Sequence, residues 1–306
     1  MNFDEASVIE VLSGIFGRNH RGVEIGIGDD AAVVSISEKA VITTDVAVEG
    51  THFSMQWSSG FEIGRKIAAA NLADIYAMGG SPRYLVVAVT LTGQESLEWI
   101  QELAEGIAHE AASCGAYIVG GDLAKGPCKS IAITAIGETD RPITRSGAKV
   151  GDSIYISSLP GWSAAGLAVI DSGLISDLAA HAIAEFRAPT VDYTSAVQFA
   201  NSQANSLCDV SDALIIQAEQ MATSSGVCFA IDKDLIAAHP EFESLRELSE
   251  FSKVDVWQWI LAGGEDHVFL ATGKALDGFC IGTVVAGAGV TGVEMKKAPD
   301  TWRHFN

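Results

Sequence analysis

The sequence predicts a protein of α/β or α+β class, in which helices pack on sheets. Segments with helical spacing of apolar residues alternate along the chain with short apolar runs typical of strands. A length of 306 residues suggests two domains rather than one. A polar stretch containing Pro and Gly, at 138–151, precedes a fresh strand. We therefore expect a boundary there, with domains at 1–138 and 139–306.

Three helices are expected in the first half. The clearest covers 94–114, where apolar residues at 97, 100, 103, 107 and 111 follow a helical period and Gly115 ends the helix. Another covers 60–78 and is closed by a glycine pair, and the first covers 4–17. Between them lie strand-like runs, namely "GVEIGIG", "KAVITTDVAVEG", "RYLVVAVTL", "AYIVGGD" and "SIAITAIGE".

The second half repeats this mixture. Helices are expected near 161–172, 190–203 and 211–225, and the final part from residue 267 is rich in strand-forming residues. The runs "SIYISS" and "GVCFAID" are the clearest strands. Taken together, the elements favour an α+β second domain.

The formal charge of −20 argues against a nucleic-acid partner or an anionic membrane surface, which need clustered Lys and Arg. Part of it lies in Glu-rich, solvated stretches such as 239–251. No window approaches the roughly 18 to 20 apolar residues of a membrane span, and the acidic start does not resemble a secretory signal. The cysteines are odd in number and form no CxxC, which favours reduced core thiols and a cytoplasmic location: Cys114, Cys128, Cys208, Cys228 and Cys280.

Seven aspartates stand beside glycines or in apolar surroundings: Asp29, Asp30, Asp45, Asp74, Asp122, Asp209 and Asp212. Each alone could equally be a turn former or a helix cap, and Ser211 or Asp212 could cap the helix that follows them. Asp74 shares a helix face with Asn71, three residues earlier. Unpaired carboxylates converging in one cleft would need cations, and oxygen ligands without His or Cys favour Mg²⁺ over Zn²⁺.

Bound Mg²⁺ would make an acidic cleft attractive to phosphates, which suggests phosphoryl transfer. The chain has no GxxxxGK[ST] and no HRD or DFG set, so neither a P-loop enzyme nor a protein kinase is expected. One GxGxxG, "GAGVTG" at 287–292, lies too near the end of the chain for a βαβ unit, and we interpret it as a turn.

The chain resembles the thiamine-monophosphate kinases, of the superfamily that includes aminoimidazole ribonucleotide synthetase and selenophosphate synthetase. The matching strings occur in family order over most of the chain: "GIGDDAAVV", "TTDVAVEGTHF", "KIAAANLADIYAMGGSPRYL", "IVGGDLAKGP", "TRSGAKVGDSIYIS", "FRAPT", "CDVSDAL" and "LAGGEDH". The resemblance implies a two-domain aminoimidazole ribonucleotide synthetase-like fold. Its N-terminal domain would bind ATP and Mg²⁺ and pair its sheet across a homodimer, and its C-terminal domain would be α+β. It also implies ATP-dependent phosphorylation of thiamine phosphate to thiamine diphosphate, with several Mg²⁺ ions between the phosphates.

The resemblance also implies roles for particular residues. The metal ligands would be Asp30, Thr43, Thr44, Asp45, Asp74, Asp122, Asp209 and Asp212, with Asp45 and Asp122 catalytic through the metal. ATP would contact Gly120, Gly121, Arg145 and Ser211, and the thiamine substrate would contact His52, Glu265 and Trp302. Asp29 is expected to brace the turn beside Asp30.

Each of these residues has a simpler interpretation. His52 could be a hydrogen-bonded core histidine, Arg145 a surface charge, the glycine pair a tight turn, and Trp302 a tail anchor. The chain also departs from the family pattern at Leu123, Ala124, Ala213 and His267, although no expected metal ligand is lost.

Two other functions stay open at this stage. The chain could be a sister ATP-dependent synthetase, although selenophosphate synthetase is disfavoured because no cysteine precedes Cys114. It could also be a non-catalytic metal–nucleotide binding protein on this scaffold.

Overall fold

The computed structural model describes residues 5–17, 20–27 and 31–294. The chain divides into two compact units, one built from Met1–Tyr76 with Gly80–Arg141 and the other from Ala77–Gly79 with Pro142–Asn306. Each unit combines helices with its own sheet, so the expected mixed α/β, two-unit class is confirmed. Among the described residues, no helix has both the length and the apolar character needed to cross a membrane.

Unit 1 contains a four-stranded sheet in the order β3-β6-β4-β5. The β3–β6 and β6–β4 pairs are antiparallel, whereas β4 and β5 are parallel and joined through α3. A small antiparallel pair, β1–β2, precedes the sheet. The bounds of the elements are α1 Glu5–Phe16, β1 Val23–Ile25, β2 Val33–Val34, β3 Lys39–Val48, α2 Gly60–Ala77, β4 Ser81–Leu91, α3 Leu97–Ser113, β5 Tyr117–Lys125 and β6 Ser130–Thr139.

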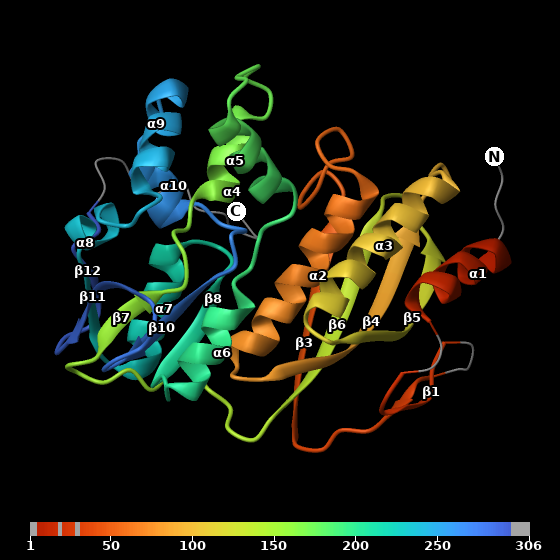
Figure 1. Ribbon diagram of the computed structural model, residues 1–306, viewed down its shortest axis with the longest axis horizontal. Helices are drawn as coiled ribbons and strands as arrows, with labels where there is room; N and C mark the ends of the chain where they lie inside the picture. Colours follow the sequence, from red (N-terminus) through yellow and green to blue (C-terminus); the bar gives the residue numbers. More distant parts are fainter. Residues whose placement is uncertain (1–4, 18–19, 28–30, 295–306) are drawn as a thin grey trace. The chain divides into compact units, whose positions relative to one another are not determined.

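The helices α2 and α3 lie side by side on one face of this sheet (Figure 1). Two glycines allow them to pack closely. A Cβ on Gly64 of α2 would lie 2.2 Å from the Leu103 carbonyl oxygen, and one on Gly106 of α3 would lie 2.1 Å from that of Phe61. Because β6 alternates buried and half-buried residues, Ile131 and Ile133 face this helical layer. The three helices expected from the sequence in this half are confirmed.

The other face of the sheet is covered only in part. The hydroxyl of Tyr84 donates hydrogen bonds to the carbonyls of Gly22 and Ser35, which fixes the β1–β2 segment over β4. On the edge strand β3, the side chains of Ile42 and Val46 are 66% and 54% exposed. Large apolar side chains on an open strand face are typical of a surface that another sheet covers.

Unit 2 contains a six-stranded mixed sheet in the order β12-β9-β11-β7-β10-β8. Only the β12–β9 pair is parallel. Its strands are β7 Ser153–Ile156, β8 Ser206–Val210, β9 Cys228–Ile231, β10 Val268–Gly273, β11 Phe279–Val285 and β12 Gly289–Thr291. Its helices are α4 Trp162–Val169, α5 Asp177–Arg187, α6 Tyr193–Asn201, α7 Leu214–Ser225, α8 Lys233–Ala237, α9 Phe242–Ser252 and α10 Val256–Ala262.

The core of unit 2 joins the sheet to its helices, with Leu214 and Met221 of α7 and Trp259 of α10 among its buried members. The helices expected near 161–172, 190–203 and 211–225 are confirmed as α4, α6 and α7, each somewhat shorter. The cysteines are free, as expected, but describing all of them as core thiols was wrong, because Cys128 is exposed.

Candidate active site

In unit 1, β3 and α2 bring four polar side chains together. Thr43 and Asp45 are two residues apart on β3, so their side chains point to the same face of the strand, the one that the helices cover. Asn71 and Asp74 are three residues apart on α2 and share a face of that helix. The Thr43 hydroxyl donates to the Asp74 carboxylate at 2.6 Å, and the Asp45 backbone N–H donates to the Asn71 amide oxygen at 3.1 Å. The fully buried Asn71 also donates to the Ile67 carbonyl at 2.9 Å, which fixes its orientation.

This arrangement keeps the Asp45 side chain exposed while its backbone is fixed. The strand-like run expected at 39–50 is confirmed as β3, which continues past Asp45 to Val48 because β6 pairs with it along its whole length. Thr44 points to the opposite face, where its hydroxyl bonds to the Ile133 carbonyl and accepts from Thr134. The structure therefore groups Thr43 with Asp45 and Asp74, and places Thr44 apart from them.

The two glycines and the aspartate of "GGD" lie inside β5 and do not form a tight turn. Gly121 pairs with Val87 of β4, and a Cβ there would lie 1.9 Å from the Val87 carbonyl oxygen. Close strand packing thus requires a glycine at 121, whereas a Cβ on Gly120 would meet nothing within 4 Å. Asp122 is exposed and lies level with Ala88, on the sheet face opposite to Asp45.

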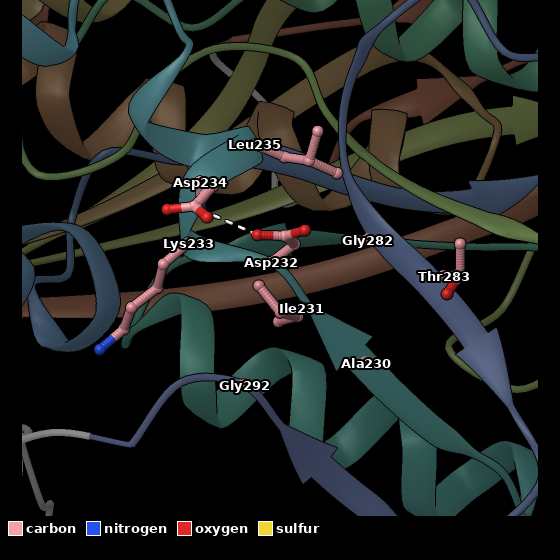
Figure 2. A pocket seen from close by; sticks show the side chains of 9 residues that line it. All are labelled: Ala230, Ile231, Asp232, Lys233, Asp234, Leu235, Gly282, Thr283 and Gly292. Atoms are coloured by element: carbon pink, nitrogen blue, oxygen red, sulfur yellow. Dashed lines mark hydrogen bonds between the residues drawn. The ribbon is translucent and has the colours of Figure 1, made fainter.

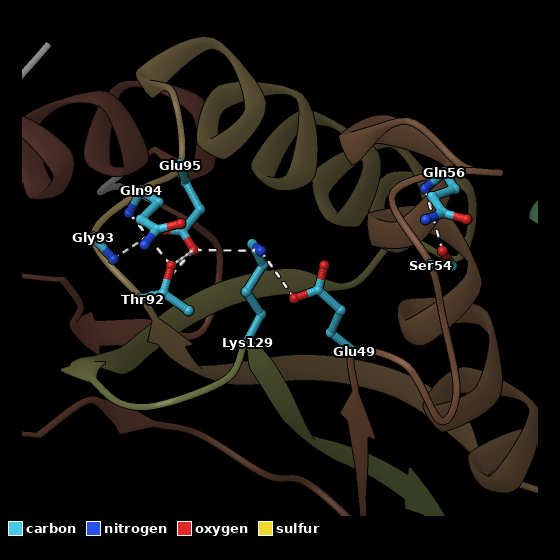
Figure 3. A network of polar contacts seen from close by, with 8 residues as sticks. All are labelled: Glu49, Ser54, Gln56, Thr92, Gly93, Gln94, Glu95 and Lys129. Atoms are coloured by element: carbon cyan, nitrogen blue, oxygen red, sulfur yellow. Dashed lines mark hydrogen bonds and ion pairs between the residues drawn. The ribbon is translucent and has the colours of Figure 1, made fainter.

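A loop after β3 carries His52. The Nδ1 atom of His52 accepts the backbone N–H of Val48 at 3.1 Å, so the ring folds back on the end of the strand. Lys129 holds the start of the loop through an ion pair with Glu49 at 2.9 Å and lies 3.6 Å from Glu95, as Figure 3 shows. The ring of His52 is half-buried and is held against the backbone at the end of β3.

Glu95 is the most buried member of this network, and its side chain is inaccessible to solvent. Burial alone would raise the pKa of Glu95, but hydrogen bonds from the Thr92 hydroxyl and from the backbone of Thr92 and Gly93 outweigh it and lower the pKa to about 2. The carboxylate is therefore ionised across the neutral range and keeps Lys129 in place beside Glu49.

In unit 2, the loop 263–267 packs against the end of β8. The backbone N–H of Glu265 donates to the Ser211 carbonyl at 2.7 Å, and that of His267 donates to the Val210 carbonyl at 3.1 Å. Gly264 is pressed against the same segment, since a Cβ there would lie 2.5 Å from the Asp212 carbonyl oxygen. The two motifs "CDVSDAL" (208–214) and "LAGGEDH" (261–267) thus form one surface.

The aspartates of this surface are held differently. The carboxylate of Asp209 is buried and lies 3.1 Å from the Nδ1 atom of His267, which is also buried. Asp212 is half-buried and accepts from the Gln217 amide at 3.4 Å. The expectation that Ser211 or Asp212 caps α7 was wrong. The cap residue is Ala213, and its N–H is bonded by the side chain of Gln217 from within the helix.

Arg145 is exposed and donates to the side-chain oxygen of Gln220 on α7 at 2.6 Å. It therefore lies beside α7, the helix that follows Ser211 and Asp212. Asp29, Asp30 and Trp302 fall outside the described residues.

The donor set suits Mg²⁺. The grouped side chains of Thr43, Asp45 and Asp74 offer only hard oxygen donors, with no sulfur or imidazole among them. Within the described ranges, no three His, Cys, Asp or Glu side chains lie together as a ready metal site. The aspartates expected to act as ligands are divided between the two units, and Asp30 lies outside the described part.

A cavity of about 460 Å³ elsewhere in unit 2 is lined by β9, the start of α8, β11 and Gly292 (Figure 2). None of the expected site residues lines it. Two acidic residues, Asp232 and Asp234, line it, and the Asp232 carboxylate caps the short helix α8 by accepting the Asp234 N–H. The "GAGVTG" run forms β12 and its flanking turns, with positive φ at Gly287, Gly289 and Gly292. It is therefore no nucleotide fingerprint.

Comparison with known proteins decides the family. Residues 28–139 match the family model "AIR synthase related protein, N-terminal domain". The chain is 36% identical over 299 residues to the thiamine-monophosphate kinase of Corynebacterium glutamicum, and the match covers 91% of this chain and 88% of the relative. The chain belongs to the thiamine-monophosphate kinase family.

Two solved structures of this family resemble the chain. The thiamine-monophosphate kinase of Stenotrophomonas maltophilia has a TM-score of 0.80 and 28% identity, and the match covers 95% of this chain and 96% of that one. A structure described as AaThiL complexed with AMPPCP and TMP has a TM-score of 0.81 and 28% identity, covering 98% and 97%. The family fold thus extends over both units, with an N-terminal sheet and a C-terminal half-barrel sheet.

Asp266, in the site region of unit 2, was not predicted from the sequence. Asp266 is buried between two residues that had been singled out, and it bonds to the start of α4. A charged residue that follows "GGE" gives no sign of such burial, because its partners lie about 100 residues earlier in the chain.

Proposed function

We propose that this chain transfers the γ-phosphoryl group of ATP to thiamine monophosphate and so forms thiamine diphosphate. The observation that carries the proposal is the match to thiamine-monophosphate kinases over nearly the whole chain. The oxygen cluster of Thr43, Asp45 and Asp74 supports it, because phosphoryl transfer depends on metal-binding carboxylates.

Several Mg²⁺ ions would be held by side-chain oxygens in both units. Bound there, Mg²⁺ would supply positive charge that neutralises the phosphates of donor and acceptor. Within the chain, Asn71 fixes the backbone of Asp45, and Thr43 orients Asp74, so these carboxylates are placed before any ligand arrives. The proposed ligands are Asp30, Thr43, Thr44, Asp45, Asp74, Asp122, Asp209 and Asp212.

For ATP, we propose contacts from Gly120 and Gly121 in β5, where a Cβ on Gly120 would meet nothing within 4 Å, and from Arg145 and Ser211 beside α7. For the thiamine substrate, we propose His52, Glu265 and Trp302. The carboxylate of Glu265 and the aromatic face of Trp302 are both suited to a cationic ring.

The acceptor is a phosphate that is already an anion at neutral pH. Its oxygen forms the new bond to the γ-phosphorus while the bond between that phosphorus and the bridging β–γ oxygen breaks, and ADP leaves with the electron pair. No side chain has to remove a proton from the acceptor. Catalysis therefore rests on positioning and charge neutralisation.

We further propose that unit 1 provides ATP binding and dimerisation, with domains at 1–138 and 139–306. The exposed Ile42 and Val46 on β3 support a dimer in which the open sheet face meets its copy. Sedimentation at micromolar concentration tests this, since Ile42→Glu with Val46→Glu should convert a dimer to a monomer. The set of free cysteines is consistent with a cytoplasmic protein.

The function is tested with purified protein, ATP, Mg²⁺ and thiamine monophosphate, followed by chromatography for thiamine diphosphate. Free thiamine is run in parallel to separate this activity from a pyrophosphokinase. Absence of thiamine diphosphate at saturating substrates would refute the proposal.

A further inference from the structure

Asp266 is a buried carboxylate with no part in the contacts proposed above; its exposed fraction is 7%. Its two oxygens each accept one backbone N–H from the start of α4, that of Gly161 and that of Ser163, both at 2.8 Å. Burial raises the pKa of Asp266 to about 6, even though these two hydrogen bonds act to lower it. At neutral pH, Asp266 is therefore an ionised carboxylate in a buried position, where its charge lowers the stability of the folded protein.

Residue 266 must accept two hydrogen bonds at once, which explains why an aspartate stands at this position. A carboxylate can accept from both N–H groups, whereas the amide of an asparagine offers one oxygen and places an NH₂ group against the second donor. Gly161 has a φ of +114°, and a Cβ there would lie 3.0 Å from the carbonyl carbon of Trp259. The start of α4 is thus packed closely against the middle of α10, which fixes its position.

The residues on either side of Asp266 are held in an unfavourable backbone conformation. Glu265 has a φ of +67° and His267 a φ of +52°, both in the left-handed region that side-chain-bearing residues avoid. Their N–H groups bond to the carbonyls of Ser211 and Val210, while the Asp266 side chain bonds to α4. The loop is therefore clamped from two directions, and the clamp maintains the strain.

We propose that Asp266 is a positioning residue that sets the Glu265 carboxylate for recognition of the cationic ring of the thiamine substrate. The proposal rests on the function proposed above. The backbone torsions of Glu265 determine where its side chain begins, and its left-handed φ persists only while the loop is clamped. Releasing Asp266 from α4 lets the loop relax and moves the Glu265 carboxylate. The affinity for the thiamine substrate therefore falls, whereas the affinity for ATP stays the same.

The test compares KM for thiamine monophosphate with KM for ATP in Asp266→Asn. We expect the first to rise about tenfold, which corresponds to about 1.4 kcal/mol of binding, and the second to change less than about twofold. The matched control is Asp192→Asn, which alters the carboxylate cap of α6, where Asp192 accepts the Ser195 N–H at 3.0 Å and its hydroxyl at 2.6 Å. Because asparagine and aspartate are about equally good helix caps, Asp192→Asn should leave the ratio of the two KM values unchanged.

A double-mutant cycle separates positioning from general destabilisation. In a Glu265→Gln background, adding Asp266→Asn should raise KM for thiamine monophosphate by less than about twofold, because the carboxylate that Asp266 positions is already gone. Full additivity would overturn the proposal. If Asp266→Asn fails to fold, Ser163→Pro provides a second variant. It removes the Ser163 N–H, one of the two donors to Asp266, in the first turn of α4, where proline is tolerated. The same double-mutant cycle is then measured with Ser163→Pro.

The outcomes distinguish the two proposals. Wild-type protein that neither phosphorylates nor binds thiamine monophosphate, by calorimetry, refutes the proposed function and this inference with it. Active wild-type protein with an unchanged KM ratio in Asp266→Asn refutes the inference alone.

Discussion

The close contact at Gly264 allows a single added methyl group to test the site in unit 2. In Gly264→Ala, the new Cβ would lie 2.5 Å from the Asp212 carbonyl oxygen and 2.6 Å from that of Ser211, whereas ordinary contact begins at 3.4 Å. The two segments must therefore separate by about 0.9 Å, the difference between 3.4 and 2.5 Å. Both obstacles are backbone atoms, so no flexible side chain can move aside.

This displacement has a kinetic and a thermodynamic consequence. It shifts Asp212, a proposed metal ligand, and a misplacement near 1 Å can lower turnover by about 100-fold. Overpacking of this kind costs about 1 to 3 kcal/mol of unfolding free energy. We therefore expect kcat to fall by one to two orders of magnitude, about 10- to 100-fold, with a measurable loss in denaturant midpoint.

Steady-state kinetics at saturating ATP, Mg²⁺ and thiamine monophosphate, together with urea unfolding, measure both effects. The matched control is Gly14→Ala in α1, where a Cβ would meet nothing within 4 Å. It should leave kcat unchanged and stabilise the helix by about 0.5 to 1 kcal/mol. Wild-type kcat and stability in Gly264→Ala would refute the close approach of these two loops and its role in the site.

Charged side chains in both units allow further tests. Asp45→Ala and Asp122→Ala should each lower kcat by about 100-fold or more. The melting temperature should stay close to that of the wild type, because both side chains are exposed. Wild-type rates at saturating Mg²⁺ in either variant would show that the residue is not part of the site. Glu265→Gln should raise KM for thiamine monophosphate about tenfold and leave KM for ATP within about twofold, since only the thiamine substrate carries a ring cation; equal effects on both would contradict its role. Glu95 has a pKa of about 2 in the folded protein against 4.5 for the unperturbed group, so the stability it contributes is complete above pH 4.5 and is lost as the pH falls through 2. Thr92→Val should therefore shift the acid-unfolding midpoint, followed by circular dichroism, to higher pH, and an unchanged midpoint would show that the Thr92 hydroxyl does not hold Glu95.

Local patterns were enough to predict much of the fold. The spacing of apolar residues placed α2 and α3, and glycines with positive φ at 79 and 115 follow them as expected. The amphipathic α9 was not predicted, because its many glutamates are typical of a solvated stretch. Its buried Phe242, Leu245 and Leu248 nevertheless follow a helical period.

Long-range pairing was harder to foresee. The strand-like run "AYIVGGD" was expected to end at Asp122, because glycines and acids are typical of turns. Instead β5 continues to Lys125, because β4 supplies hydrogen-bond partners along its length. The sheet face of Asp122 likewise depends on register with β4, which no local pattern reveals.

In the candidate site too, contacts that follow from local spacing were predictable, whereas contacts between distant segments were not. The pairing of Asn71 and Asp74 on one helix face followed from their spacing and is confirmed by their contacts with β3. The bond from Asp266 to α4 and the contact of Asp209 with His267 join segments far apart in the chain. Such contacts follow from tertiary packing and not from residue type.

This chain makes thiamine diphosphate from thiamine monophosphate in the function proposed above. The most direct measurement follows thiamine diphosphate and ADP together by chromatography, with thiamine monophosphate, ATP and Mg²⁺ at saturation. The two products should form in a ratio of one to one, and free thiamine should give no product. ADP released without thiamine diphosphate, or thiamine diphosphate made from free thiamine with release of AMP, would contradict it.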